Sequence, residues 1–420
     1  MKKYTFLPLC FAVISMLCYG CSSDSDSDIV IDENENQDDL EDTTDSETYF
    51  LIADQQNNEA HLINYDGDEL FNWEFGRSLG NDINLLSDGS MVVCLKATNA
   101  SITYGGYGGI FRKINADQTI DWEVSYSTDD YTAHHDVEYL SNGNIIFPVW
   151  SELSQAEASE KGFAANYNLN PESIIEMNPI TEEIVWEWHS MDHIIQDYDN
   201  TKANYGVVSE NPNKIDVNYN YQTRSDGDIM HINGLTLDEE NDLLYLTVNN
   251  YSEIWVIDHS TTTNESSTNT GGNYGLGGDL VYRFGNPETY DNIGESTLSN
   301  VHYPNLLDTG NMLAYANDVF NNQSQVVEYE LNPPYELIAG QNNEPTVVWS
   351  FTNSDLYSSG LSSAVRMDNG NTLIAEGRDG TLWEVNSQGE IEWLYKTNYA
   401  TIWRSYVFYA EDPAVVALGL

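Results

Sequence analysis

Short runs in which apolar and polar residues alternate recur along the chain from about residue 48 onward. Each unit reads as a strand, a tight turn, an apolar strand and two further strands. The turns are rich in Asn, Asp and Gly, which supply the positive φ angles that short hairpins need. They are Ser87-Asp88-Gly89, Asn142-Gly143, Glu240-Asn241-Asp242, Thr309-Gly310 and Asn369-Gly370. The pattern therefore predicts repeated four-stranded units and no long helix.

A large aromatic residue recurs in the last strand of every unit, which makes six units. These residues are Trp73, Trp122, Trp186, Tyr282, Trp349 and Trp393. We expect them to pack between neighbouring sheets, with no ligand role. The final segment, TIWRSYVFYAED, reads as a strand that completes the first unit and closes a ring, which removes exposed sheet edges. The predicted fold is an all-β, six-bladed β-propeller over residues 48–420; two β-sandwiches, the alternative, would not explain six equal units.

Two long segments interrupt the repeats, at residues 190–227 and 260–278. Long insertions on one face of a propeller usually cover the mouth of its channel. Either segment could therefore form a lid, or a solvated surface loop. The second is rich in Gly, Thr and Asn, and for it we favour the surface loop.

The N-terminus reads as a targeting segment. Lys2 and Lys3 precede an apolar run that is too short to span a membrane permanently. Gly20 stands before Cys21, and a Ser/Asp run follows at once, which resembles a bacterial lipoprotein signal. We therefore expect residues 1–20 to be a signal peptide and Cys21 to carry a lipid, with an ordinary secretory peptide as the alternative. Residues 21–47 are predicted to be a disordered acidic tether. The protein is therefore expected to be an exported lipoprotein of the periplasm, outer membrane or cell surface.

The charge balance narrows the range of partners. The chain has 15 Lys and Arg against 68 Asp and Glu, a formal net charge of -53. Nucleic acids and anionic lipid surfaces both need cationic patches, so neither is an expected partner, and membrane contact is expected only through the N-terminal anchor. Cys94, the one cysteine that processing leaves free, lies in an apolar strand and reads as a buried small hydrophobe.

Three histidines occupy equivalent points of their units. His135 and His302 each stand eight residues before the turn glycine, and His231 opens the unit between them. Equivalent positions in the blades of a propeller converge on one central channel, so we expect the three imidazoles to face each other.

Two chemistries suit three such imidazoles. They could bind zinc or another divalent metal, or one could accept and transfer an electrophilic group while the others stabilise its oxygens. Asn233, two residues after His231, suits the second role because its amide is a fixed donor. His134 and His135 are adjacent, so in a strand their side chains would point to opposite faces, and Asp136 would point away from His135.

Several stretches between Ile52 and Ala414 resemble the bacterial arylsulfate sulfotransferases that do not use a nucleotide sulfate donor. They are HHDVEYLSNGN, IVWEWHSMDHIIQDYD, DIMHINGLTLDEENDLLYLTV, GGNYGLGGDLVYRFGNPETY, SSAVRMDNGNTLIAEGRDGTLWEV and WRSYVFYAEDP. The resemblance implies a six-bladed propeller with its active site at the channel. It also implies ping-pong transfer of a sulfuryl group from a phenolic sulfate ester to a phenol, without a cofactor.

The resemblance also implies roles for single residues. His302 would be the nucleophile that is transiently sulfated. His231, Asn233 and the histidine of the HHD motif would bind sulfuryl oxygens and assist proton transfer. That histidine is either His134 or His135, and the repeat register favours His135.

The chain departs from the family pattern at Asn249, where the best-studied pattern has an arginine that would grip the sulfate through two hydrogen bonds. Arg404, Arg283 or Arg224 could enter the channel in its place. Tyr303 and Pro304 also follow the proposed nucleophile where an acidic or small residue is usual. The family's N-terminal sandwich domain and its disulfide have no counterpart in this chain.

The sequence thus leaves three hypotheses. The first is an aryl-sulfate sulfotransferase with a small aromatic sulfate donor and a phenolic acceptor. The second is a non-catalytic surface propeller that binds a sulfated or aromatic ligand, and the third is a metal-dependent hydrolase.

Overall fold

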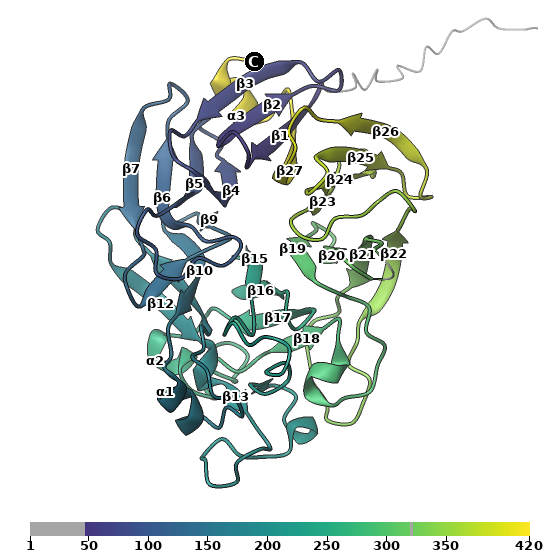
Figure 1. The fold of residues 1–420 in the computed structure, drawn as a ribbon. Helices are drawn as coiled ribbons and strands as arrows, with labels where there is room; N and C mark the ends of the chain where they lie inside the picture. The colour runs from purple at the N-terminus through teal and green to yellow at the C-terminus, as the bar shows by residue number, and fades with distance from the viewer. Residues whose placement is uncertain (1–46, 320–321) are drawn as a thin grey trace, which may run out of the picture. The chain divides into compact units, whose positions relative to one another are not determined.

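The computed structural model describes residues 47–319 and 322–420. The predicted signal peptide at 1–20, Cys21 as the predicted site of a lipid, and the predicted tether as far as residue 46 lie outside the described residues. In the described part, strands dominate and every helix is short. Six sheets stand side by side around a common centre (Figure 1), which confirms the six-bladed β-propeller and excludes two β-sandwiches.

Each of the first three blades is an antiparallel sheet whose strands follow one another from the channel outward. Blade 1 consists of β27 (Ile402–Tyr409), β1 (Thr48–Asp54), β2 (Glu59–Ile63) and β3 (Glu69–Glu74). Blade 2 consists of β4 (Leu79–Leu85), β5 (Met91–Lys96), β6 (Gly109–Ile114) and β7 (Ile120–Ser125). Blade 3 has a divided inner strand and consists of β8 (Tyr131–Ala133) with β9 (Glu138–Tyr139), then β10 (Ile145–Ser151), β11 (Glu172–Met177) and β12 (Ile184–His189).

The other three blades follow the same order. Blade 4 consists of β15 (Ile232–Asp238), β16 (Leu243–Val248), β17 (Glu253–Asp258) and β18 (Tyr282–Phe284). Blade 5 consists of β19 (Val301–Leu306), β20 (Met312–Ala316), β21 (Gln325–Glu330) and β22 (Thr346–Phe351). Blade 6 consists of β23 (Ser363–Arg366), β24 (Thr372–Glu376), β25 (Thr381–Val385) and β26 (Ile391–Lys396).

The ring closes as the sequence predicts. The C-terminal strand β27 pairs antiparallel with β1, from Thr48 opposite Tyr409 to Asp54 opposite Ile402. This pairing supplies the innermost strand of blade 1 from the far end of the chain, so β1 is hydrogen-bonded on both sides.

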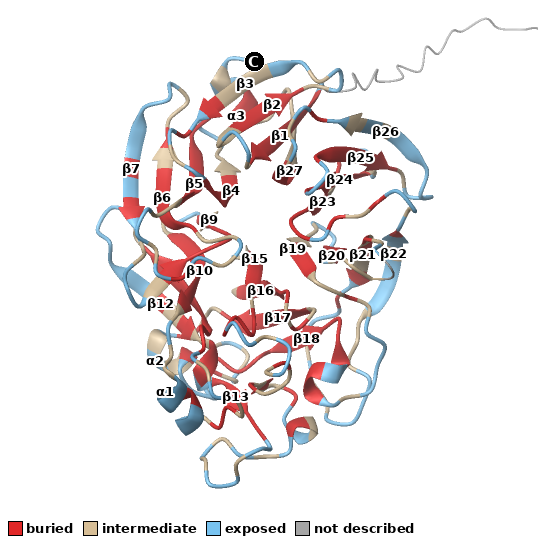
Figure 2. Cartoon of the chain, in the orientation of Figure 1, coloured by how far each residue is buried: buried red, intermediate tan, exposed pale blue. Residues whose placement is uncertain are grey.

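The core lies between the inner and middle strands of adjacent blades, whereas the outermost strands face solvent on one side (Figure 2). Strand β1 is buried along its whole length, and β7 alternates between exposed and buried residues. Of the six closing-strand aromatics, Trp73, Trp122, Trp186 and Tyr282 are buried, which confirms that these four belong to the core. The other two, Trp349 and Trp393, are only half-buried because β22 and β26 are the most exposed strands.

The two insertions differ in how they pack. The first contains η1 (Ser190–Asp192), β13 (Ile194–Ile195), η2 (Val208–Glu210) and β14 (Ile215–Asp216), and several of its apolar side chains join a core cluster with Trp188 and Trp255. The second carries α2 (Thr263–Ser266), where the Ser266 hydroxyl donates to the Glu187 carbonyl at 2.6 Å, and most of its other residues are exposed or half-buried.

Three further short elements complete the fold: α1 (Gln155–Glu160), η3 (Pro287–Tyr290) and α3 (Pro413–Leu418). Cys94 is fully buried in β5, as its apolar strand predicts. No helix within the described residues is long and apolar enough to cross a membrane.

Candidate active site

One cavity of about 420 Å³ is lined by residues of all six blades, and His135, His231 and His302 are among them. The His135 and His231 ring centroids are 4.6 Å apart. The Trp403 ring lies 5.7 Å from His135 and 6.1 Å from His302. The other lining residues are Gln55, Lys96, Thr103, Tyr104, Gly105, Gly106, Tyr107, Asn249, Asn300, Ser359, Gly360, Leu361 and Arg378. The structure therefore brings the three repeat-related histidines together, and no residue of the two insertions lines this cavity.

The backbone turns sharply at two of these histidines. His135 and His231 have φ values of 56° and 58°, in the left-handed region that residues other than glycine rarely adopt. Such conformations cluster at functional sites because the surrounding structure must hold them in place. Strand β8 ends at Ala133, so His134 and His135 do not alternate as strand residues would. The expectation that their side chains point to opposite faces is wrong: their Nδ1 atoms are 2.9 Å apart.

His302 is held in one tautomer by an asparagine. The Asn317 amide nitrogen donates to the carbonyls of Ser358 (2.9 Å) and Leu361 (3.1 Å), so its oxygen is the group that faces His302. His302 Nδ1 lies 2.5 Å from that oxygen and 3.1 Å from the Asn300 carbonyl, and it must therefore donate a proton. Nε2 is left with the lone pair, which accepts from the Leu361 amide at 3.2 Å. Burial lowers the pKa of His302 to about 3, so the ring is neutral near pH 7.

His231 has a buried carboxylate partner. Its Nδ1 lies 2.5 Å from Asp228 Oδ2, and the Asp228 carbonyl accepts a hydrogen bond of 2.6 Å from Asn250. A carboxylate beside one ring nitrogen fixes the orientation of the ring and leaves Nε2 free for proton transfer. Sequence reasoning missed Asp228, although it precedes His231 by three residues in DIMHIN.

His135 ends a buried polar chain. Glu172 Oε2 lies 2.9 Å from His134 Nε2, and His134 Nδ1 in turn contacts His135. His134 is fully buried and stacked 3.6 Å from Trp150, so His135 is the histidine of this motif that lines the cavity. Burial lowers the pKa of both histidines well below the usual value and raises that of Glu172. Sequence reasoning also missed Glu172.

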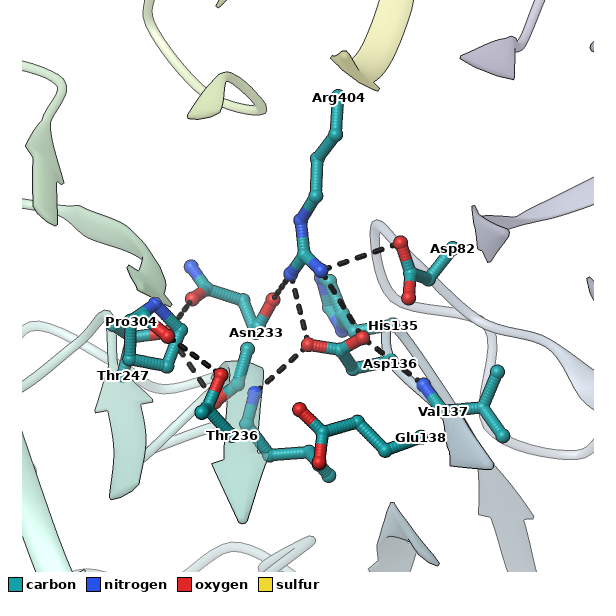
Figure 3. A network of polar contacts seen from close by, with 12 residues as sticks. Asp82, His135, Asp136, Val137, Glu138, Asn233, Thr236, Thr247, Pro304 and Arg404 are labelled. Carbon is teal, nitrogen blue, oxygen red and sulfur yellow. Dashed lines mark hydrogen bonds and ion pairs between the residues drawn. The ribbon is translucent and has the colours of Figure 1, made fainter. Parts of the chain in front are cut away.

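Arg404 lies beside the cavity in a buried ionic network (Figure 3). Its two terminal nitrogens contact both carboxylate oxygens of Asp136, at 3.1 and 2.9 Å, and the Asn233 carbonyl accepts from Nη2 at 3.1 Å. Asp82 lies 3.3 Å from Nη1, and the guanidinium stands 4.4 Å from the centre of the Tyr303 ring. Burial and the charge of Asp136 raise the pKa of Asp82 well above its usual value.

Asp136 and Tyr303 each directly follow a cavity histidine, and Asn233 lies two residues after the third. Arg404 therefore ties blades 3, 4 and 5 to the C-terminal strand at the level of the histidines. The structure gives it internal partners and does not place it among the residues that line the cavity.

Asn233 also has internal partners. Its amide nitrogen donates to the Val301 carbonyl at 2.9 Å, and its oxygen accepts from the Thr247 hydroxyl at 2.7 Å, so the structure does not bring it to the cavity. Asn249 does line the cavity and donates to the same Val301 carbonyl at 3.3 Å.

Arg283 is also fully buried, with Glu253 Oε1 at 2.9 Å and the Lys214 carbonyl at 2.8 Å. Neither Arg283 nor Arg224 is among the residues that line the cavity. The cations that do line it are Lys96 and Arg378, which sequence reasoning did not single out. Among the described residues, no group of three or more His, Cys, Asp or Glu side chains is arranged to hold a metal ion.

Fold and site together define a β-propeller with a histidine-lined axial cavity. The family model for arylsulfotransferase (ASST) matches residues 33–266, more than half of the chain. The chain therefore belongs to the arylsulfotransferase family, and this membership supports an arylsulfotransferase-like function. No curated protein matches the chain significantly.

The solved structures that match the chain share little sequence with it. A protein of unknown function from Bacteroides caccae is 12% identical, with a TM-score of 0.48 over 86% of this chain and 99% of that one. A putative 6-phosphogluconolactonase from Bacteroides fragilis is 11% identical, with a TM-score of 0.46 over 87% of this chain and 99% of that one. A virginiamycin B lyase from Staphylococcus aureus is 12% identical, with a TM-score of 0.36 over 76% and 72% of the two chains. None of these similarities bears on activity.

Proposed function

We propose that the protein transfers a sulfuryl group from a phenolic sulfate ester to a phenolic acceptor through a covalent intermediate on His302. The observation that carries the proposal is the tautomer of His302. The Asn317 amide oxygen accepts a hydrogen bond from Nδ1, so Nδ1 keeps its proton. The lone pair therefore resides on Nε2 of a neutral ring that lines the cavity. Membership in the arylsulfotransferase family supports the same chemistry.

In the first half-reaction, His302 Nε2 attacks the sulfur of the donor and the bond between sulfur and the aryl oxygen breaks. The electron pair of that bond leaves with the aryl oxygen, which takes a proton from Nε2 of His231. The Asp228 carboxylate stabilises His231 while that ring holds the proton. His302 then carries the sulfuryl group, and the Leu361 amide beside Nε2 must turn from the ring nitrogen toward a sulfuryl oxygen.

In the second half-reaction, His231 takes the proton of the acceptor phenol as the phenol oxygen attacks sulfur. The bond from sulfur to His302 breaks, and its electron pair returns to Nε2. Both histidines thus recover their starting protonation, so the residues of the chain complete the cycle. His135 faces the same cavity, where its neutral ring can contact a sulfuryl oxygen.

The test is turnover of a chromogenic aryl sulfate with a phenol as acceptor. We expect wild type to release phenolate and the His302→Ala variant to lose essentially all activity. His189→Ala is the matched control because His189 is half-exposed in β12 and does not line the cavity. A wild type without turnover, or a His302→Ala variant as active as wild type, would contradict the proposal.

Two observations favour a second function. His302 Nε2 already accepts a hydrogen bond, and Asn249 occupies the place of the family arginine. A propeller that only binds a sulfated aromatic ligand would keep that hydrogen bond. Thermal stabilisation by an aryl sulfate, without turnover of any donor, would identify this function.

We also propose, from the sequence of residues 1–28, that the protein is exported and anchored through a lipid on Cys21. The Cys21→Ser variant should then leave the membrane fraction. If it stays with the membrane as wild type does, the lipid anchor is wrong.

A further inference from the structure

Cations are scarce in this chain, and most of those in the described residues have a carboxylate partner. Within residues 47–319 and 322–420, every lysine and arginine except three forms an ion pair with Asp or Glu at 4.0 Å or less. The three exceptions are Lys96, Arg224 and Arg378. Lys96 and Arg378 both line the histidine cavity, whereas Arg224 does not.

The walls of the cavity provide no partner either. No aspartate or glutamate is among the residues that line it, although the chain has 68 of them. In a protein with a formal charge of -53, a cavity with two cations and no carboxylate is complementary to an anion. A carboxylate in the wall would compete for the cations and repel a charged substrate.

The two cations come from the blades on either side of blade 1. Lys96 ends β5 of blade 2, and its Nζ lies 4.8 Å from the centre of the Tyr107 ring, which also lines the cavity. Burial lowers the pKa of Lys96, and a bound anion would offset the loss of hydration that causes this.

Arg378 follows β24 of blade 6 and reaches the loop beside the nucleophile. The Arg378 side chain packs against Gly360 of that loop, where its Nη2 would lie 3.6 Å from a Cβ atom built on the glycine. The amide of the next residue, Leu361, donates to His302 Nε2 at 3.2 Å. The guanidinium therefore stands across a single loop from the atom that would attack sulfur. A guanidinium can donate two parallel hydrogen bonds to sulfate oxygens.

We infer that Lys96 and Arg378 bind the sulfate group of the donor and supply the positive charge that Asn249 does not. The inference rests on the proposed function for the identity of the anion. It makes the two residues the determinants of donor binding: a sulfate ester is held by charge, and a neutral aromatic of the same shape is not.

The experiment measures binding without chemistry. Toluenesulfonate resembles an aryl sulfate donor, but its sulfur is bonded to carbon and cannot be transferred. Its dissociation constant is determined by calorimetry for wild type, Lys96→Gln and Arg378→Gln, with methyl tolyl sulfone as the neutral probe. The matched control is Arg224→Gln, because Arg224 is the third cation without a carboxylate and lies outside the cavity.

We expect each cavity variant to bind toluenesulfonate at least about tenfold more weakly, the effect of losing one hydrogen bond to a charged group. Arg224→Gln should bind like wild type, Lys96→Arg should restore binding, and the sulfone should bind all proteins equally. Equal sulfonate affinity in wild type and both cavity variants would overturn the inference. So would a loss of affinity in Arg224→Gln as large as in the cavity variants, or the absence of sulfonate binding to wild type.

Binding and turnover separate the two claims. Wild type that binds toluenesulfonate through Lys96 and Arg378 but turns over no aryl sulfate would remove the proposed function and leave the anion site. If turnover depends on His302 but neither Lys96→Gln nor Arg378→Gln changes sulfonate binding, the proposed function stands and the anion site is wrong.

Discussion

Replacement of Asp228 by asparagine tests how the site moves protons. The variant keeps the shape of the side chain but removes the charge that lies 2.5 Å from His231 Nδ1. An amide can also donate to Nδ1, which would favour the tautomer with its proton on Nε2. That tautomer cannot take a proton from the acceptor.

The expected magnitude follows from the burial of the pair. Asp228 is 5% exposed, so water screens its contact with His231 little. A hydrogen bond to a charged group contributes about 1.5 to 3 kcal/mol, and because about 1.36 kcal/mol is a factor of ten in rate, kcat should fall about 10- to 150-fold. Fold and donor affinity should change little, because Asp228 does not line the cavity.

The assay compares two donors under single-turnover conditions. A nitrophenyl sulfate releases a stable phenolate that needs no proton, so its first half-reaction should be nearly unaffected in Asp228→Asn. An alkylphenyl sulfate releases a basic phenolate, so its first half-reaction should slow by the full factor. Asp226→Asn, an exposed carboxylate two residues earlier, is the control and should match wild type. Equal slowing for both donors, or none, would refute the assignment of His231 as the proton carrier.

Two further predictions concern stability. Because burial holds the pKa of His302 at about 3 while an ordinary histidine titrates at 6.5, only the unfolded chain takes up this proton between those values. Stability should therefore be lost as the pH falls from 6.5 toward 3, and denaturant titrations should show a shallower loss for His302→Gln; an unchanged slope would contradict the buried neutral ring. Arg404→Met should cost about 3 to 5 kcal/mol of unfolding free energy because it strands the buried charge of Asp136. Arg77→Met is the control: it removes a half-exposed ion pair with Glu123 and should lower the free energy of unfolding by less than about 1 kcal/mol. An equally small loss in both variants would show that the Arg404 network is not important for stability.

The fold was accessible from the sequence because its signals are local and repeat. Alternating strands, Asn/Gly turns and one aromatic per unit specify the blades, and the leftover strand at 402–409 has a single place to pair. The convergence of His135, His231 and His302 follows from the same repeat, since equivalent positions of a propeller face one axis.

The parts that the sequence did not reveal depend on contacts between distant segments or on irregular backbone. The rule of alternating strand faces fails at His134 and His135 because β8 stops at Ala133 and His135 turns left-handed. Arg404 looked free to bind substrate because Asp136, its partner, is 268 residues away in the sequence. Lys96 and Arg378 lie outside the repeat position of the histidines, so only the assembled cavity identifies them.

The most direct test of the central claim is to find the sulfuryl group on the protein. Wild type and His302→Ala are incubated with an aryl sulfate and no acceptor, quenched at alkaline pH and digested for peptide mass analysis. The account predicts the added mass of one SO₃ on the peptide that contains His302, lost when a phenol is supplied and absent in the variant. Turnover without any adduct, or an adduct on a different residue, would contradict it.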